Sequence, residues 1–238
     1  MHPQADRVFC AVDTADEAVA ADLAGRLAEV VGGVKLGLEF FLANGPAAVA
    51  RVAAGRRLFL DLKLHDIPNT VAAGVRSVAP LRPFCLTLHA SGGEAMLKAA
   101  AAAAKQAAAD GGSPRMRLLG VTVLTSLGEP DLARLGQVGP IADQVRRLAE
   151  LSRECGLDGV VCSPHEVADL RARCGPDFLL VTPGVRPTWA ATDDQQRVMS
   201  PAEAVAAGAD YLVIGRPITR NPDPAAAAAR IVRELAAA

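Results

Sequence analysis

The chain has 238 residues, of which 51% are hydrophobic and only 3% aromatic, so it can bury a large and mainly aliphatic core. Its net charge of −1 gives no support for binding to nucleic acid or to an anionic membrane surface. The amino-terminal residues lack the pattern of a secretory signal, and no charge-free apolar run is long enough to span a bilayer. Five cysteines without a Cys-x-x-Cys pair favour reduced thiols, so we expect a cytoplasmic protein.

Short apolar segments alternate with helix-like segments along the whole sequence. We expect strands at residues 8–13, 33–38, 58–63, 84–89, 118–124, 159–162, 178–182 and 211–214. We expect a helix after Thr14, where Glu17 completes a capping box. An Ala-rich helix through Ala109 is expected to end at Gly111 and Gly112. The other helices are expected at residues 46–54, 69–78, 130–135, 141–155, 164–174, 200–207 and 224–238.

Eight strand–helix units in this length predict an α/β fold, a single (β/α)8 (TIM) barrel domain over residues 1–238. An open doubly wound sheet is the alternative. It is disfavoured because no Gly-x-Gly-x-x-Gly motif follows any of the expected strands.

The segment from Arg57 to Thr70 is the most informative. Its leucines fall on one strand face: Leu58, Leu60, Leu62 and Leu64. Phe59, Asp61 and Lys63 fall on the other, so a carboxylate and an ammonium point into the same partly buried space. Buried charges are costly unless they are paired or used. A structural Asp–Lys pair on an edge strand is the alternative interpretation.

Other expected strands also end in polar residues, and in a barrel these ends form the active-site face. Asp13 ends the first strand, Lys35 lies in the second, His89 ends the fourth, and Thr125-Ser126 follows the fifth. Two Asp–Lys combinations at one barrel mouth indicate function. No His, Cys and Asp cluster has metal-ligand spacing, and no Ser or Cys has a nearby base, so we expect neither a metal site nor a covalent nucleophile.

The last two strands are followed by a phosphate-binding pattern. Pro183-Gly-Val-Arg186 follows the seventh strand and Gly215-Arg216 the eighth, which are the positions where barrels often hold phosphate. Gly215 would let a backbone N–H approach an oxyanion, and Arg216 could bind it bidentately. The long loop at residues 186–197 is expected to act as a lid over that phosphate.

Together these residues resemble the orotidine 5′-phosphate decarboxylase family. The run Asp61-Leu-Lys63-Leu-His-Asp66-Ile67-Pro-Asn-Thr70 is similar to the family signature. The resemblance extends over the whole chain through Ala11-Val-Asp13, Lys35, Leu124-Thr-Ser126, Pro183-Gly-Val-Arg186, Asp193-Asp-Gln195 and Ile214-Gly-Arg216.

The resemblance implies a homodimer that converts orotidine 5′-phosphate to UMP, the last step of UMP synthesis, with no cofactor and no metal. It implies that Lys63 donates a proton to C6 within a charged array of Lys35, Asp61 and a partner-supplied Asp66. The resemblance implies that Asp13 and Lys35, with the other subunit's Thr70, bind the ribose, and that Thr125 or Ser126 contacts the pyrimidine. It implies that the phosphate is bound by Arg186, Gln195, Gly215 and Arg216. The further substrate-binding residues that it implies are Asp61, Ile67 and Pro183. Strand parity favours Ser126 over Thr125.

Two other functions stay open. A Mg²⁺-dependent sugar-phosphate decarboxylase or aldolase of the same superfamily resembles the chain in Asp-x-Lys-x-x-Asp, but it carries an acidic ligand in the second strand, where Lys35 would repel the metal. A non-catalytic phosphosugar-binding barrel would keep Gly215 and Arg216, but it would not need Asp61, Lys63 and Asp66.

Overall fold

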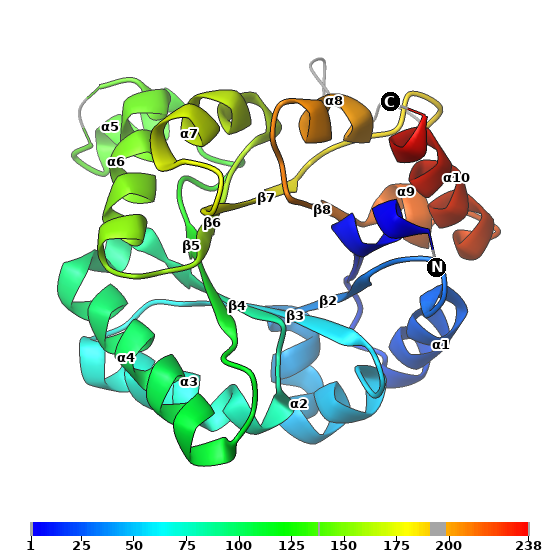
Figure 1. Cartoon of the computed structure of the whole chain (residues 1–238), viewed down its shortest axis with the longest axis horizontal. Helices are drawn as coiled ribbons and strands as arrows, with labels where there is room; N and C mark the ends of the chain where they lie inside the picture. The colour runs from blue at the N-terminus through cyan, green and yellow to red at the C-terminus, as the bar shows by residue number, and fades with distance from the viewer. Residues whose placement is uncertain (1, 138, 191–198, 238) are drawn as a thin grey trace.

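The computed structural model describes residues 2–137, 139–190 and 199–237. Eight parallel strands form a closed barrel in sequence order, with helices packed around the outside (Figure 1). The strands are β1 (Val8–Val12), β2 (Gly33–Gly37), β3 (Arg57–Leu64), β4 (Cys85–His89), β5 (Arg117–Val121), β6 (Gly159–Val161), β7 (Leu179–Pro183) and β8 (Tyr211–Ile214). The predicted (β/α)8 fold is therefore confirmed.

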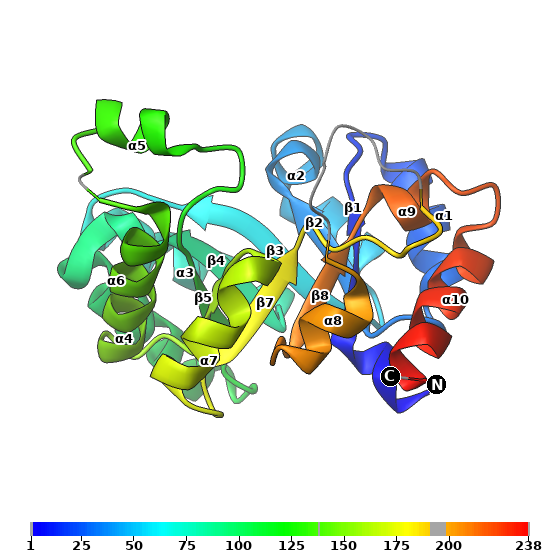
Figure 2. The ribbon, with the colours of Figure 1, turned by 90° about the horizontal axis from the view of Figure 1, so that it is seen from above.

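The α-helices are α1 (Glu17–Leu27), α2 (Leu38–Val52), α3 (Pro68–Val78), α4 (Gly93–Gly111), α5 (Glu129–Arg134), α6 (Ile141–Glu154), α7 (Val167–Cys174), α8 (Pro201–Ala206), α9 (Arg216–Thr219) and α10 (Pro224–Ala236). Short 3₁₀ helices lie at Pro3–Arg7, Ala79–Leu81, Ala90–Gly92 and Pro164–Glu166. Figure 2 shows that α5 stands apart from the ring formed by the other helices. None of the helices in the described part has both the length and the apolar character needed to cross a bilayer.

The alternation of side chains predicted for β1 and β3 is confirmed. Phe9 and Ala11 of β1 and Phe59 of β3 belong to a small cluster inside the barrel. The residues between them in sequence, such as Cys10 and Leu60, belong to the larger cluster between the barrel and the helices. The inward faces of the strands therefore lead along the barrel axis to its carboxyl end, where polar residues follow.

Two local predictions were wrong. Asp16, and not Thr14, caps α1, because Asp16 Oδ1 accepts hydrogen bonds from the backbone N–H groups of Ala18 (2.8 Å) and Val19 (3.1 Å). Glu17 does not complete a capping box, since its carboxylate binds Arg51 at 2.6 Å.

The helix predicted at residues 46–54 is only the second part of α2. Helical backbone already begins at Leu38, directly after β2, and Gly45 interrupts it with a φ of +72°. The first part was missed because its apolar run has no clear helical period. A further helix that the pattern did not predict is α9, which begins at Arg216.

All five cysteines are buried and free. Burial raises the pKa of the Cys10 thiol to about 12, so this side chain is protonated at neutral pH and behaves as a small apolar residue.

A cluster of aromatic rings around Arg57 closes the amino-terminal end of the barrel. The Arg57 Cζ atom lies 3.9 Å from the ring centroid of Phe84, 5.2 Å from that of Phe9 and 5.4 Å from that of Tyr211. Arg57 Nη1 also donates to the backbone carbonyl of Asp6 at 3.2 Å. A guanidinium stacked on several aromatic faces stabilises the packing at this end.

We predict that Arg57→Leu lowers the free energy of unfolding by about 1–2 kcal/mol, because the substitution removes the cation–π contacts and the hydrogen bond to Asp6. Urea denaturation of the purified chain measures this loss. Arg233→Leu, at an exposed position of α10, is the matched control and should change stability by less than about 0.5 kcal/mol. Equal midpoints and slopes for the two variants would contradict the proposed role of Arg57.

Candidate active site

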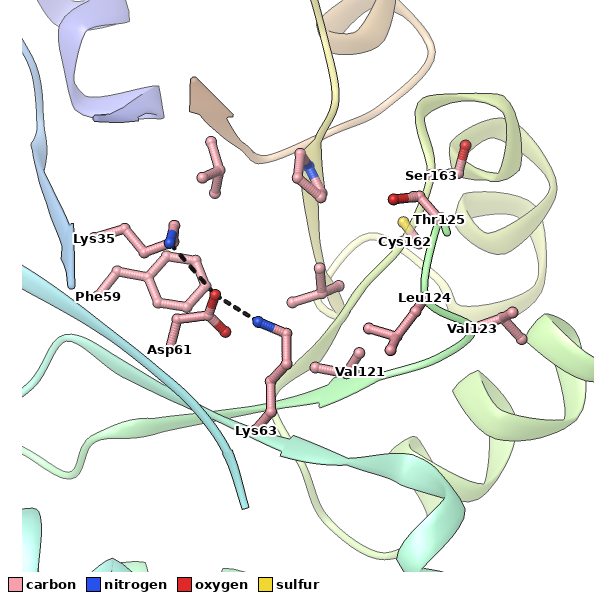
Figure 3. Close-up of a pocket in the computed structure, with 13 residues that line it drawn as sticks. Lys35, Phe59, Asp61, Lys63, Val121, Val123, Leu124, Thr125, Cys162 and Ser163 are labelled. Carbon is pink, nitrogen blue, oxygen red and sulfur yellow. Dashed lines mark hydrogen bonds and ion pairs between the residues drawn. The ribbon is translucent and has the colours of Figure 1, made fainter. Parts of the chain in front are cut away.

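The carboxyl ends of β1, β2 and β3 bring four charged side chains together in alternating order. Lys35 Nζ lies 3.1 Å from Asp13 Oδ1 and 3.5 Å from Asp61 Oδ2. Lys63 Nζ lies 2.7 Å from the same Oδ2 of Asp61. Figure 3 shows the Asp61 carboxylate between the two ammonium groups. The structure therefore joins the two Asp–Lys combinations that the sequence predicted at one barrel mouth.

The centre of this array is withdrawn from water. Asp61 and Lys35 are each only 9% exposed. Burial by itself raises the pKa of the Asp61 carboxyl, but Lys35 and Lys63, together with hydrogen bonds from Lys63 and Thr87, hold that pKa below its ordinary value. Asp61 is therefore ionised at neutral pH, and together with Asp13 it balances the charges of the two nearby ammonium groups.

The backbone of Lys63 has an unusual conformation for a strand residue. Its φ of +49° lies in the left-handed region, which costs a non-glycine residue about 1–2 kcal/mol. The register between β3 and β4 shifts between Leu60 and Leu64, so the ladder is interrupted around Lys63. Backbone strain of this kind concentrates at functional sites. Strand alternation could not predict this irregularity, although it placed Lys63 on the correct side of the strand.

A cavity of about 200 Å³ lies beside the charged array (Figure 3). One wall carries Lys35, Asp61 and Lys63. The remaining walls are mainly apolar and are formed by Phe59, Val121, Val123, Leu124, Thr125, Val161, Cys162, Ser163, Pro183 and Val213. A second cavity of about 170 Å³ adjoins the same three charged residues and also contacts Asp13 and Leu38. The array thus separates two spaces, one largely apolar and one more polar.

The structure places Thr125 on the wall of the larger cavity, and Ser126 is not among the residues that line it. Strand parity does not apply at Ser126, because β5 ends at Val121 and the alternation does not continue into the turn that follows. Which of the two residues contacts a pyrimidine stays a prediction.

The two arginines of the predicted phosphate site also come together. Arg186 and Arg216 line one cavity of about 320 Å³, and Arg220 lines the same cavity. Arg220 was not predicted from the sequence, although its spacing of four residues from Arg216 places both on one side of the turn that begins with α9. Gly215 packs against β1, since a Cβ added there would lie 3.4 Å from the Cβ of Ala11.

The predicted lid at residues 186–197 is described only up to residue 190. The motif Asp193-Asp-Gln195, with the expected phosphate ligand Gln195, lies outside the described residues.

Three predicted site residues do not reach the charged array of their own chain. Asp66 and Ile67 lie at the connection from β3 to α3 and Thr70 lies in the first turn of α3; all three are exposed and outside the lining of both cavities at the array. The carboxylate of Asp66 accepts a hydrogen bond from the backbone N–H of Ile67 at 2.6 Å. A role for Asp66 beside the partner's Lys63 stays a prediction.

Two histidines lie near the array without joining a recognisable metal site. The rings of His65 and His89 are 5.4 Å apart. Burial, followed by the charges of His65 and Lys63, lowers the pKa of His89, so that its imidazole is neutral at pH 7. Within the described residues, no group of three or more His, Cys, Asp or Glu side chains has a metal-binding arrangement.

Comparison with known proteins gives a consistent result along the chain. The family described as orotidine 5′-phosphate decarboxylase / HUMPS matches residues 6–231. Over 230 residues the chain is 56% identical to the orotidine 5′-phosphate decarboxylase of Rhodospirillum rubrum, an alignment that covers 96% of this chain and 93% of that protein. The corresponding enzyme of Paramagnetospirillum magneticum is 54% identical over 229 residues, with 96% and 97% coverage.

A solved structure agrees in fold. The crystal structure of orotidine 5′-phosphate decarboxylase from Lactobacillus acidophilus superposes with a TM-score of 0.82 at 37% sequence identity, and the match covers 96% of this chain and 98% of that one. The extent and level of these similarities confirm the resemblance seen in the sequence: the chain belongs to the orotidine 5′-phosphate decarboxylase / HUMPS family.

Proposed function

We propose that this chain decarboxylates orotidine 5′-phosphate to UMP, the last step of UMP synthesis, with Lys63 as the proton donor. The observation that carries the proposal is the position of the Lys63 ammonium, held at 2.7 Å by a buried Asp61 on the wall of a largely apolar cavity. The family and its curated relatives support the same reaction.

The reaction requires what this arrangement offers. When the bond between C6 and the carboxylate breaks, CO2 leaves and the electron pair stays on C6. An ammonium beside C6 stabilises this negative charge and then donates a proton to it, which gives UMP. Lys63 supplies that ammonium, and Asp61 keeps it charged and oriented. Because these groups are fixed before the reaction begins, little reorganisation is needed as charge develops.

The cavities suggest where each part of the substrate binds. In our proposal the pyrimidine occupies the larger cavity, with Thr125 or Ser126 at its edge and Pro183 on its wall. Asp13 and Lys35, which adjoin the second cavity, bind ribose hydroxyls. The phosphate is bound by Arg186 and Arg216, whose guanidinium groups suit bidentate contact with its oxygens, together with Gly215 and the expected Gln195.

Lys35 argues against a magnesium-dependent reaction of the same superfamily. Its Nζ lies 3.1 Å from Asp13 Oδ1 and 3.5 Å from Asp61 Oδ2, and so the ammonium occupies the space between the two carboxylates where a divalent cation would otherwise be held. A positive charge at this point repels a metal ion. We therefore propose a reaction without metal or other cofactor.

A non-catalytic phosphosugar-binding barrel is also less consistent with the site. Such a protein would need the arginines of the phosphate pocket but would gain nothing from the charged array at the barrel mouth. Withdrawing Lys35 and Asp61 from water carries a desolvation penalty that binding of a phosphosugar does not require. The array is instead the arrangement expected of a catalytic site.

We further propose that the chain forms a homodimer with active sites shared across the interface. Large apolar side chains are exposed beside the barrel mouth: Leu42 is 77% and Leu38 45% exposed on α2, and Ile67 is 66% exposed before α3. Leu38 also lines the second cavity, so this apolar surface adjoins the charged array. A second copy that covers it would place the exposed Asp66 and Thr70 next to the partner's array. The buried free cysteines fit a reducing compartment, and we propose a cytoplasmic location.

The first prediction tests the reaction itself. The wild-type chain should convert orotidine 5′-phosphate to UMP at an undiminished rate in excess EDTA, and Lys63→Ala should lose at least ~10³-fold in kcat because both charge stabilisation and proton donation are removed. Absorbance loss and chromatographic detection of UMP measure this. Lys98→Ala, an exposed lysine of α4, is the matched control. Activity that EDTA abolishes and Mg²⁺ restores would favour the magnesium-dependent alternative.

The second prediction concerns the phosphate. Arg216→Ala should lower kcat/KM for orotidine 5′-phosphate by about 10²-fold or more, because a charge-assisted contact is lost. The slow decarboxylation of orotidine, which has no phosphate, should change by less than about 3-fold. Arg233→Ala serves as the control. Equal losses on the two substrates would show that Arg216 does not bind phosphate.

The third prediction tests the shared site. Lys63→Ala and Asp66→Ala homodimers should each be nearly inactive, because every site lacks one group. Refolding the two variants together should produce mixed dimers in which one site lacks both groups and the other is intact. With random pairing about half of the dimers are mixed, so about a quarter of wild-type activity should return if the sites act independently. Confirmed subunit exchange without recovered activity would place Asp66 in the site of its own chain.

A further inference from the structure

We propose that Thr87 is a positioning residue for this reaction, whose single hydroxyl orients the Asp61 carboxylate and holds the strained backbone of Lys63. This inference rests on the proposed decarboxylase function. Thr87 lies in β4, it is fully buried, and it is not among the residues that line the cavities at the array. It therefore acts through the two charged residues and not through contact with substrate.

The hydrogen bonds of Thr87 have only one possible arrangement. Its Oγ1 donates to Asp61 Oδ1 at 2.8 Å and accepts from the backbone N–H of Lys63 at 2.9 Å. An ionised carboxylate can only accept, and a backbone N–H can only donate, so the orientation of the hydroxyl is determined by its partners. No exposed surface remains at Thr87 through which bulk water could replace either bond.

The two oxygens of Asp61 therefore have different partners. Oδ1 is held by Thr87, whereas Oδ2 lies 2.7 Å from Lys63 Nζ and 3.5 Å from Lys35 Nζ. Without the bond at Oδ1, the carboxylate could turn about its terminal torsion, and Oδ2 would move relative to both ammonium groups. The hydroxyl therefore helps to determine where the Lys63 ammonium points.

The strand register explains why a side chain, and not a backbone carbonyl of β4, accepts the hydrogen bond from the Lys63 N–H. Leu60 of β3 pairs with Leu86 of β4, and Leu64 pairs with Leu88. Three residues of β3, including Asp61 and Lys63, thus lie opposite the single residue Thr87. The ladder is interrupted there, and the threonine hydroxyl provides the acceptor for the Lys63 N–H. Satisfying this partly buried donor stabilises the left-handed conformation of Lys63.

Threonine suits the position because its β-branch restricts χ1, so the hydroxyl is held in place before substrate binds. Serine would keep both hydrogen bonds with less restraint. Valine would keep the shape and lose both bonds, which would leave the partly buried Lys63 N–H and the Oδ1 of Asp61 without their partner.

The test compares Thr87→Val and Thr87→Ser with Thr122→Val. Thr122 is a fitting control because it is also buried, directly follows β5, and donates its hydroxyl to a backbone carbonyl, that of Val161, at 3.1 Å. Its substitution removes a hydroxyl at the same end of the barrel without touching Asp61 or Lys63. Steady-state kinetics with orotidine 5′-phosphate and calorimetric titration with UMP are the measurements, and circular dichroism checks the fold.

We expect Thr87→Val to lose about 10²-fold in kcat, since a small displacement of a catalytic group has an effect of this size. KM and the affinity for UMP should change by less than about 3-fold, because the loss concerns the transition state and not ground-state binding. Thr87→Ser should recover most of the lost kcat, and Thr122→Val should stay within about 3-fold of wild type. A purely structural role for Thr87 would not produce this split or this rescue.

The opposite results would overturn the inference: a kcat for Thr87→Val no lower than that of Thr122→Val, a loss confined to KM, or no recovery in Thr87→Ser. If Thr87→Val does not fold, Thr87→Cys replaces it, because a thiol of similar size is a poor donor and acceptor, and the same criteria apply. A wild-type chain that does not decarboxylate orotidine 5′-phosphate overturns the proposed function and this role together. An active wild type with unaffected Thr87 variants overturns the role alone.

Discussion

The pairing of a buried carboxylate with two ammonium groups is the interaction on which the site depends. Asp61 is almost withdrawn from solvent, and without Lys35 and Lys63 its negative charge would be strongly disfavoured there. With them, the carboxylate stays ionised and in turn keeps both lysines close to the barrel axis. Removal of Asp61 would take away the carboxylate that lies between the two lysines, so the three residues function as a unit.

The barrel separates the residues that stabilise it from those that carry the chemistry. At the amino-terminal end, Arg57 and the rings around it form closely packed contacts that need no ligand. At the carboxyl end, the same strand continues into Asp61 and Lys63, and the left-handed φ of Lys63 shows that the backbone departs from ideal strand geometry there. One strand thus contributes to stability at its start and to the site at its end, which is the division expected of a (β/α)8 barrel.

In the proposed dimer, the site also depends on the apolar surface around the barrel mouth. A single chain presents Leu42 and Ile67 to solvent, and its own Asp66, the further carboxylate expected beside Lys63, is exposed and outside the array. In the proposed dimer, both features have one explanation, because the contact that buries the apolar side chains also supplies the missing carboxylate. Catalysis and association would then depend on the same residues of the connection between β3 and α3.

The sequence by itself determined the architecture and most members of the candidate site. Strand alternation and the eight repeated units predicted the barrel, because a side-chain period of two and the spacing of helices are properties of the local chain. The same alternation placed Phe59, Asp61 and Lys63 on the inward face. Asp13 and Arg216 were identified from their places at strand ends and Lys35 from its place within the second strand, since parallel strands bring such residues to one end of the barrel.

Other features were decided only by the tertiary structure, because they depend on contacts between segments far apart in sequence. The shift in register opposite Thr87 and the strained backbone of Lys63 arise from how β3 meets β4. The turn that carries Thr125 to the cavity lies beyond the end of β5, where alternation no longer applies. The sequence could therefore name the charges of the site, but only the packing of neighbouring strands decided how they are held.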